Sequence, residues 1–172
     1  IETIYLGGGT PSQLSQEELE SIFATIYNIY KVKEDAEITL EANPDDLTPE
    51  YVSILRQLPI NRISMGIQTF REETLRLLHR RHTAQQAKEA FHRCREAGFQ
   101  NISIDLMYGL PGETLETWKE DLRQAIALHP EHISAYHLIY EEGTVLWKLK
   151  EKHQVEEADE DLSVSLFKTL IE

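Results

Sequence analysis

The residues best suited to bind a ligand stand near the ends of four strand-like stretches. Three glycines and a threonine, Gly7 to Thr10, follow the first stretch, and Glu41, Gln68 and Asp105 stand near the ends of the next three. Glycine adds chain entropy that folding must remove, so we expect a ligand or another backbone to approach closely here. The N–H groups that glycine frees can cradle an anion such as a carboxylate. The segment matches neither the P-loop, whose lysine it lacks, nor the GxGxxG fingerprint.

Five short β-type runs alternate with helical patterns along the chain, and no hairpin turn joins the runs. They span residues 3–7, 36–43, 61–68, 101–109 and 132–139. Ser15 with Glu18 resembles the capping box that begins a helix, and Gly98 favours the end of one. The alternation predicts one α/β domain, residues 1–172, with a parallel sheet of too few strands to close as an eight-stranded barrel.

The polar residues of these runs are predicted to share one face of the sheet, because alternate side chains point to opposite faces. In the run 101–109 the apolar residues alternate with Asp105, and Glu41, Gln68 and Tyr136 are likewise out of phase with apolar neighbours. A doubly wound sheet would need two apolar faces, so one polar face favours a barrel-like interior with a site at its rim. Two simpler roles stay open: Glu41 could cap the turn that follows it, and Gln68 could satisfy loop backbone.

Composition restricts the class of protein. The net charge of −13 disfavours nucleic acid as a partner. No apolar run reaches membrane-spanning length, and no signal peptide leads the chain. The single cysteine, Cys94, falls on a helical apolar stripe with Ala87, Ala90 and Phe91, which predicts a buried core thiol. One cysteine cannot form an intramolecular disulfide and suits a reducing compartment, so we expect a cytoplasmic protein.

Six motifs occur in a fixed order: "YLGGGTPSQL", "EANPDDLTPE", "NRISMGIQTF", "LHRRHTAQQA", "GFQNISIDLMYGLPGET" and "HISAYHLIYEEGT". In this combination, nearly the whole chain resembles the radical S-adenosylmethionine (SAM) proteins of the oxygen-independent coproporphyrinogen III oxidase family. The resemblance implies an incomplete parallel (β/α) barrel whose interior holds SAM and a 4Fe–4S cluster. The chain is then expected to be the central part of such a domain, truncated at its N-terminus.

The resemblance also implies the positions that contact SAM. Gly8, Gly9 and Thr10 would receive the amino and carboxylate groups of its methionine moiety. Polar contacts with the ribose and the methionine end are implied for Glu41, Gln68, Arg80 and Asp105. Ile139, after Tyr136, would contact the adenine by backbone or apolar packing. Without the resemblance, Arg80 could equally be a solvated charge in the segment "HRRH".

The chain departs from the family at the metal-binding motif. Family members bind the cluster through Cys-x3-Cys-x2-Cys, and no such motif occurs here, since Cys94 is the only cysteine. The chain as given is therefore expected to bind no cluster and to cleave no SAM, and the motif is expected upstream of Ile1 in a longer protein. His79 and His82 could share one helical face, but no third ligand accompanies them, so no metal site is predicted within the chain.

Three functions remain open at this point. The stretch "SAYHLIYEEGTVLW" resembles the heme chaperone branch of the family more than the oxidase branch, which favours a chaperone that binds heme or porphyrin. A heme-accepting protein and an electron donor would be its partners. The alternatives are the oxidoreductase itself, a coproporphyrinogen III oxidase, and an unrelated α/β barrel in which the glycines bind an anion. The oligomeric state is open, although apolar surface beside the run 3–7 predicts self-association.

Overall fold

The computed structural model describes residues 1–172 and contains one five-stranded sheet. The strands are β1 (Thr3–Leu6), β2 (Glu37–Ala42), β3 (Arg62–Gln68), β4 (Asn101–Tyr108) and β5 (His132–His137). They lie side by side in chain order, and every neighbouring pair is parallel. The predicted α/β fold with an incomplete parallel barrel is confirmed.

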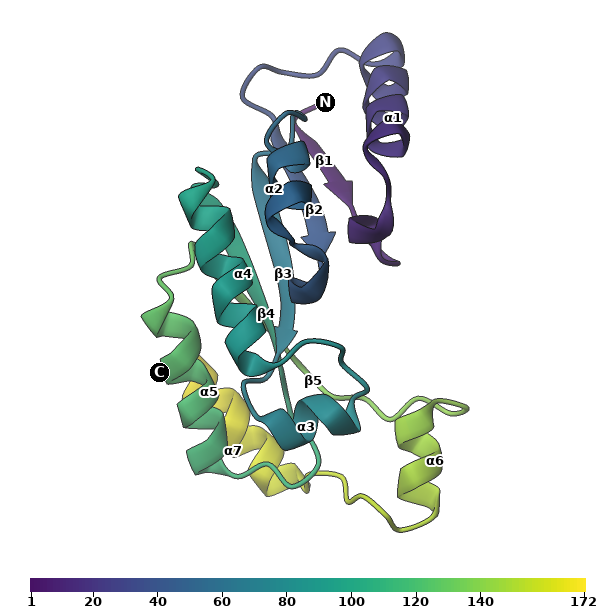
Figure 1. Ribbon diagram of the computed structural model, residues 1–172. Helices are drawn as coiled ribbons and strands as arrows, with labels where there is room; N and C mark the ends of the chain where they lie inside the picture. The colour runs from purple at the N-terminus through teal and green to yellow at the C-terminus, as the bar shows by residue number, and fades with distance from the viewer.

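Helices connect the strands and cover the outside of the curved sheet (Figure 1). They are α1 (Gln16–Ile29), α2 (Pro49–Leu55), α3 (Glu72–Leu77), α4 (Ala84–Glu96), α5 (Leu115–Ala127), α6 (Val145–Glu151) and α7 (Glu160–Ile171), with short 3-10 turns η1 (Pro11–Gln13) and η2 (Pro44–Asp46). Parallel strands joined in chain order by right-handed crossovers place their connecting helices on one face. The other face of the sheet is therefore left free of helices, and the polar side chains occupy it.

The core lies between the sheet and the helices, as the alternation of the strands predicts. The centres of β3 and β4 contribute fully buried side chains, among them Ile63, Met65 and Ile104. Phe91 and Cys94 of α4 meet them from the helical side and are equally buried. Burial raises the pKa of the Cys94 thiol to about 12, so this cysteine is the predicted inert core residue.

Local signals begin and end the helices where the sequence predicts. Ser15 and Glu18 form a reciprocal capping box at the start of α1. Gly98 has φ +97° directly after α4, in the left-handed region that glycine adopts readily. The last strand is shorter than predicted and ends at His137. Ile139 consequently lies in the following loop, outside the sheet.

Helix α7 returns from the end of the chain to lie beside α5 (Figure 1). Trp118 of α5 is fully buried, and its indole Nε1–H donates a hydrogen bond to the carbonyl of Leu166 at 3.0 Å. The ring also lies against Tyr108, with centroids 5.5 Å apart. Trp118 therefore joins the sheet to α7.

Helix α6, by contrast, stands apart from the sheet and has no buried residue. None of the helices combines the length and apolarity needed to cross a membrane.

The loop between β4 and α5 contains a buried acid. Glu113 is only 5% exposed, and its Oε2 accepts hydrogen bonds from the backbone N–H groups of Gly109 at 2.6 Å and Leu110 at 3.3 Å. Its other oxygen, Oε1, is buried without a partner. Burial disfavours the charged form and raises the pKa of Glu113 from 4.5 to about 7. The folded protein therefore binds this proton more tightly than the unfolded chain does.

We expect a Glu113→Gln variant to lose part of the pH dependence of stability. Because the pKa is higher in the folded state, Glu113 contributes stability below pH 4.5, and that contribution disappears as the pH rises to about 7. Glutamine imitates the protonated acid and does not titrate. The free energy of unfolding of the variant, relative to that of the wild type, should therefore be roughly 2–3 kcal/mol higher at pH 8 than at pH 5. Urea unfolding at both pH values measures this gain. An unchanged difference between the two proteins would show that Glu113 is charged throughout.

Candidate functional site

A cavity of about 320 Å³ opens on the helix-free face, at the carboxyl ends of the strands. This is the end at which parallel α/β sheets place their ligand sites, and the volume is at the lower limit of the usual range for ligand pockets. Of the nine positions singled out in the sequence, seven line the cavity: Gly9, Thr10, Glu41, Gln68, Arg80, Asp105 and Tyr136. The remaining two, Gly8 and Ile139, do not line it. Ile139 is 74% exposed, and its proposed contact with a ligand stays a prediction.

In the loop after β1, glycine is needed at each of the three positions for a different physical reason. A side chain on Gly7 would collide with Tyr5 and Glu41, because its Cβ would lie 2.6 Å from Tyr5 Cε1 and 2.7 Å from Glu41 Cδ. Gly8 has φ +90°, which disfavours any other residue. Gly9 has no atom within 4 Å of the position of a Cβ, so its backbone is open on the side of the cavity. Gly9 is therefore the part of the loop that a ligand can approach.

Glu41 supports the glycine loop from the neighbouring strand. Its Oε1 accepts a hydrogen bond from the hydroxyl of Tyr5 at 2.8 Å, and its Oε2 accepts one from the backbone N–H of Gly8 at 3.0 Å. The side chain thus binds the preceding glycine loop. It does not cap the turn that follows it, the simpler role that the sequence left open. The backbone N–H of Gly8 is thus already paired with Glu41, and the proposed contact of Gly8 with a ligand stays a prediction.

Asp105 is the carboxylate at the centre of the polar face. The hydroxyl of Ser64 on the adjacent strand lies 3.1 Å from both carboxylate oxygens. Burial raises the pKa of Asp105, and the negative charge of Glu41 raises it further. Neither an arginine nor a lysine forms an ion pair with Asp105. The pair Glu41 and Asp105 therefore gives the cavity a negative region suited to a cationic group.

Gln68 ends β3 in a conformation that few residues adopt. Its φ is +72°, and the pairing of β3 with β4 shifts register between Gly66 and Gln68. The side-chain Oε1 accepts a hydrogen bond from the hydroxyl of Tyr136 at 2.6 Å, so the amide contacts the opposite wall of the cavity and does not serve loop backbone. Strained backbone of this kind costs about 1–3 kcal/mol and is concentrated at functional sites.

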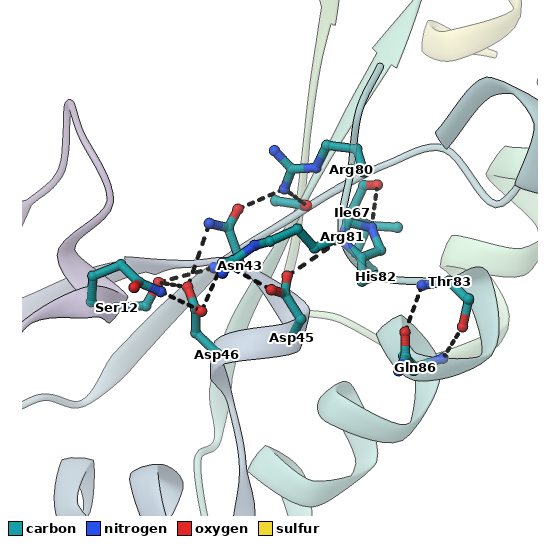
Figure 2. A network of polar contacts seen from close by, with 12 residues as sticks. Ser12, Asn43, Asp45, Asp46, Ile67, Arg80, Arg81, His82, Thr83 and Gln86 are labelled. Carbon is teal, nitrogen blue, oxygen red and sulfur yellow. Dashed lines mark hydrogen bonds and ion pairs between the residues drawn. The ribbon is translucent and has the colours of Figure 1, made fainter. Parts of the chain in front are cut away.

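Arg80 provides the cation of the cavity, and it is not a solvated charge. Its Nη2 donates to the side-chain Oδ1 of Asn43 at 2.6 Å and to the carbonyl of Gly66 at 2.8 Å (Figure 2). Neither Nη1 nor Nε donates to the protein, so these nitrogens are free to bind a carboxylate. Gly66, beside the guanidinium, makes room for Gln68 and not for Arg80. A Cβ at position 66 would lie only 3.0 Å from Gln68 Nε2, but at an ordinary contact distance of 3.5 Å from Arg80 Nη2.

The two neighbouring histidines do not share a helical face. His79 and His82 both lie in the linker between α3 and α4, so the expectation that they share a helix is wrong. His79 is exposed, whereas His82 is 2% exposed with its Nε2 at 3.2 Å from the carbonyl of Ile67. Burial lowers the pKa of His82, and the charge of Arg80 lowers it further. His82 is therefore a neutral, buried residue that attaches the linker to the end of β3.

The sequence reasoning missed several residues that line the cavity. The polar ones are Tyr5, Ser12, Asn43, Ser64 and Ser134. Alternation in β1, β3 and β5 already assigns Tyr5, Ser64 and Ser134 to the polar face, so the same signal that found Asp105 could have found them. Asn43 follows β2, where alternation gives no guidance, and its position depends on the turn η2.

The sequence model of the Radical SAM superfamily matches residues 1–125 of the chain. The chain belongs to this superfamily. The polar face therefore lines the interior of a radical SAM half-barrel, and Glu41, Asp105 and Arg80 stand on its rim. Membership also excludes the hypothesis of an unrelated anion-binding barrel.

The most similar relatives include heme chaperones. The chain is 43% identical to the heme chaperone HemW of Bacillus subtilis over 88% of its length, and 41% identical to that of Escherichia coli over 84%. It is 36% identical to the oxygen-independent coproporphyrinogen III oxidase of Synechocystis over 81%. These matches cover 40%, 38% and 30% of the relatives. The radical SAM chain thus spans less than half the length of the curated relatives it matches.

Solved structures show the same half-barrel. The structure of coproporphyrinogen III oxidase (HemN) from Escherichia coli, a radical SAM enzyme, superposes with a TM-score of 0.84 at 25% identity. The match covers 99% of this chain and 39% of HemN. The Elp3 protein of Methanocaldococcus infernus superposes with a TM-score of 0.81 at 18% identity, over 96% of this chain and 43% of the other. The second likeness shows the fold alone.

Proposed function

We propose that the cavity on the polar face binds SAM and that the protein is a HemW-like heme chaperone. The observation that supports SAM binding most directly is the set of groups around one cavity. It comprises two carboxylates without cationic partners, Glu41 and Asp105, one arginine with free donors, Arg80, and open backbone at Gly9 beside Thr10. Residues 1–172 would form the central part of the radical SAM domain.

The chemistry of SAM fits these groups. Its sulfonium and ammonium are cations, its methionine end carries a carboxylate, and its ribose offers two hydroxyls. Glu41 and Asp105 would accept from the ribose and attract the cations, while Arg80 would bind the carboxylate. Gly9 and Thr10 would add backbone contacts to the methionine end. Gly8, Gln68, Tyr136 and Ile139 would complete the site from its edges.

The chain itself offers no ligands for an iron–sulfur cluster. Radical SAM proteins use SAM together with a 4Fe–4S cluster, and thiolates hold such clusters. Cys94 is fully buried on the helical side of the sheet, and its raised pKa keeps it a thiol. No group of three acidic, histidine or cysteine side chains is arranged to bind a metal ion. We therefore assign SAM, and not the cluster, to the residues of this chain.

The chaperone reading is favoured over the oxidase reading by the curated relatives. The chain is 43% identical to HemW of Bacillus subtilis and 41% identical to HemW of Escherichia coli, and 36% identical to the oxidase of Synechocystis. Heme or a porphyrin would then be the ligand of the whole protein, a heme-accepting protein and an electron donor its partners, and the cytoplasm its location. The oxidase, which decarboxylates coproporphyrinogen III, is the alternative.

The full-length protein, reconstituted anaerobically with its cluster, separates the two functions. We expect a saturable shift of the Soret absorbance when hemin is titrated into it, and no release of carbon dioxide from coproporphyrinogen III in the presence of SAM and a reductant. Decarboxylation at a rate well above a cluster-free control would assign the protein to the oxidase branch. Absence of both signals would reject the HemW-like function.

A further inference from the structure

Arg80 belongs to neither a strand nor a helix, so other residues must fix its position. It lies in the linker between α3 and α4, and within the protein its guanidinium contacts only Asn43 and the carbonyl of Gly66. A long flexible side chain loses rotamer entropy when it is held in place. Arg80 therefore depends on these two acceptors, of which only Asn43 can be removed by substitution.

Asn43 is itself held by a network that joins three loops (Figure 2). Its backbone N–H donates to the hydroxyl of Ser12 at 3.3 Å, and the same hydroxyl donates to Asp46 Oδ2 at 2.7 Å. The other oxygen of Asp46 accepts from Gln13 Nε2 at 2.5 Å and from Arg81 Nη2 at 2.8 Å. Asp46 thus connects the loop after the glycines, the turn η2 and the linker that carries Arg80.

The charge of Asp46 is favoured inside this network. Its side chain is only 8% exposed. Burial alone would raise the pKa of Asp46, but hydrogen bonds from Ser12, Gln13 and Arg81 outweigh burial and lower it. The network is therefore a charged and hydrogen-bonded support. Ser12 and Asn43 are its members that line the cavity, and of these two only Asn43 binds Arg80.

We infer that Asn43 is a positioning residue, which holds Arg80 through Nη2 so that Nη1 and Nε face the carboxylate of the bound ligand. The inference rests on the proposed binding of SAM. It explains why the shortest contact of Arg80, 2.6 Å to Asn43 Oδ1, uses a neutral amide. A carboxylate at that place would compete with the ligand's own carboxylate for the guanidinium, whereas an amide fixes it and leaves its charge available.

The test is a calorimetric titration of SAM into the intact protein and its Asn43→Ala variant. We expect the variant to bind SAM roughly tenfold more weakly, since one hydrogen bond to a charged group is lost. In an Arg80→Gln background the further change Asn43→Ala should have no effect, because Asn43 acts through Arg80. Asn43→Asp keeps an acceptor oxygen but adds a charge that competes with the ligand's carboxylate for the guanidinium and repels Asp46, so its affinity for SAM should also fall below that of the wild type.

Asn61→Ala is the matched control for folding. The side chain of Asn61 accepts from Ile38 N–H and donates to the carbonyl of Ala36, both at 2.8 Å, at the far end of the strands. Denaturant unfolding should show a loss of stability for this variant while its affinity for SAM stays at the wild-type value. Equal affinity of wild type and Asn43→Ala, or additive losses in the Arg80→Gln background, would overturn the inference alone. Failure of the wild type to bind SAM would overturn the proposed function together with it.

Discussion

Replacing Asp105 with asparagine is expected to weaken the binding of SAM roughly 10- to 100-fold, because a charge beside a bound cation is removed. The same change should raise the free energy of unfolding of the unliganded protein. Burial and the charge of Glu41 raise the pKa of Asp105, so the folded state holds this carboxylate at a cost. Asparagine keeps an oxygen that accepts from Ser64. Titration calorimetry and urea unfolding measure the two effects.

Asp121 provides the control for this prediction. It is also a buried aspartate whose pKa is raised by burial, and it accepts hydrogen bonds from Thr69 at 2.5 Å and from the backbone N–H of Phe70 at 2.9 Å. It does not line the cavity. Asp121→Asn should leave the affinity for SAM unchanged. If Asp105→Asn bound SAM as tightly as the wild type, Asp105 would not contact the cation.

Replacing Trp118 with alanine is expected to lower the free energy of unfolding by about 3–5 kcal/mol, the usual cost of removing a buried tryptophan. The ring is fully buried, lies against Tyr108 and donates to the carbonyl of Leu166. Its loss opens a cavity and also releases α7 from α5. Urea unfolding, together with proteolysis near residues 152–159, should reveal both effects.

Trp118→Phe separates the two contributions. Phenylalanine fills most of the volume but cannot donate a hydrogen bond to Leu166, so the loss should fall to roughly 1–2 kcal/mol. Helix α7 should then stay protected from proteases. A loss for Trp118→Ala as small as that for Trp118→Phe would show that α7 does not depend on this side chain.

Alternation along the strands accounts for most of what could be predicted. It separates the core residues, such as Ile63 and Ile104, from the polar face that carries Asp105, and it does so because one face of each strand is apolar and packs against the helices. Parallel strands bring their carboxyl ends to one rim. Glu41, Gln68 and Tyr136 could for this reason be expected to lie near one another, although they are far apart in the sequence.

The unpredicted features lie in loops, where no period guides the reasoning. Asn43 is positioned by the hydrogen bond that its backbone N–H donates to Ser12, a residue 31 positions earlier, and Arg80 is positioned by Asn43 in turn. The hydrogen bond that occupies Gly8 depends on the close approach of Glu41 from the next strand. The end of β5 at His137, before Ile139, likewise depends on tertiary structure. Such contacts follow from tertiary structure and not from local pattern.

Hydrogen–deuterium exchange of the wild-type protein with and without SAM tests the central claim most directly, because it locates the ligand without a substitution. We predict that SAM slows exchange of backbone amides in two regions: the glycine loop, at Gly9 and Thr10, and the carboxyl ends of β3 and β4. Exchange along α6 and α7 should be unchanged. Protection confined to other segments, or none at saturating SAM, would contradict the claim that this polar rim is the SAM site.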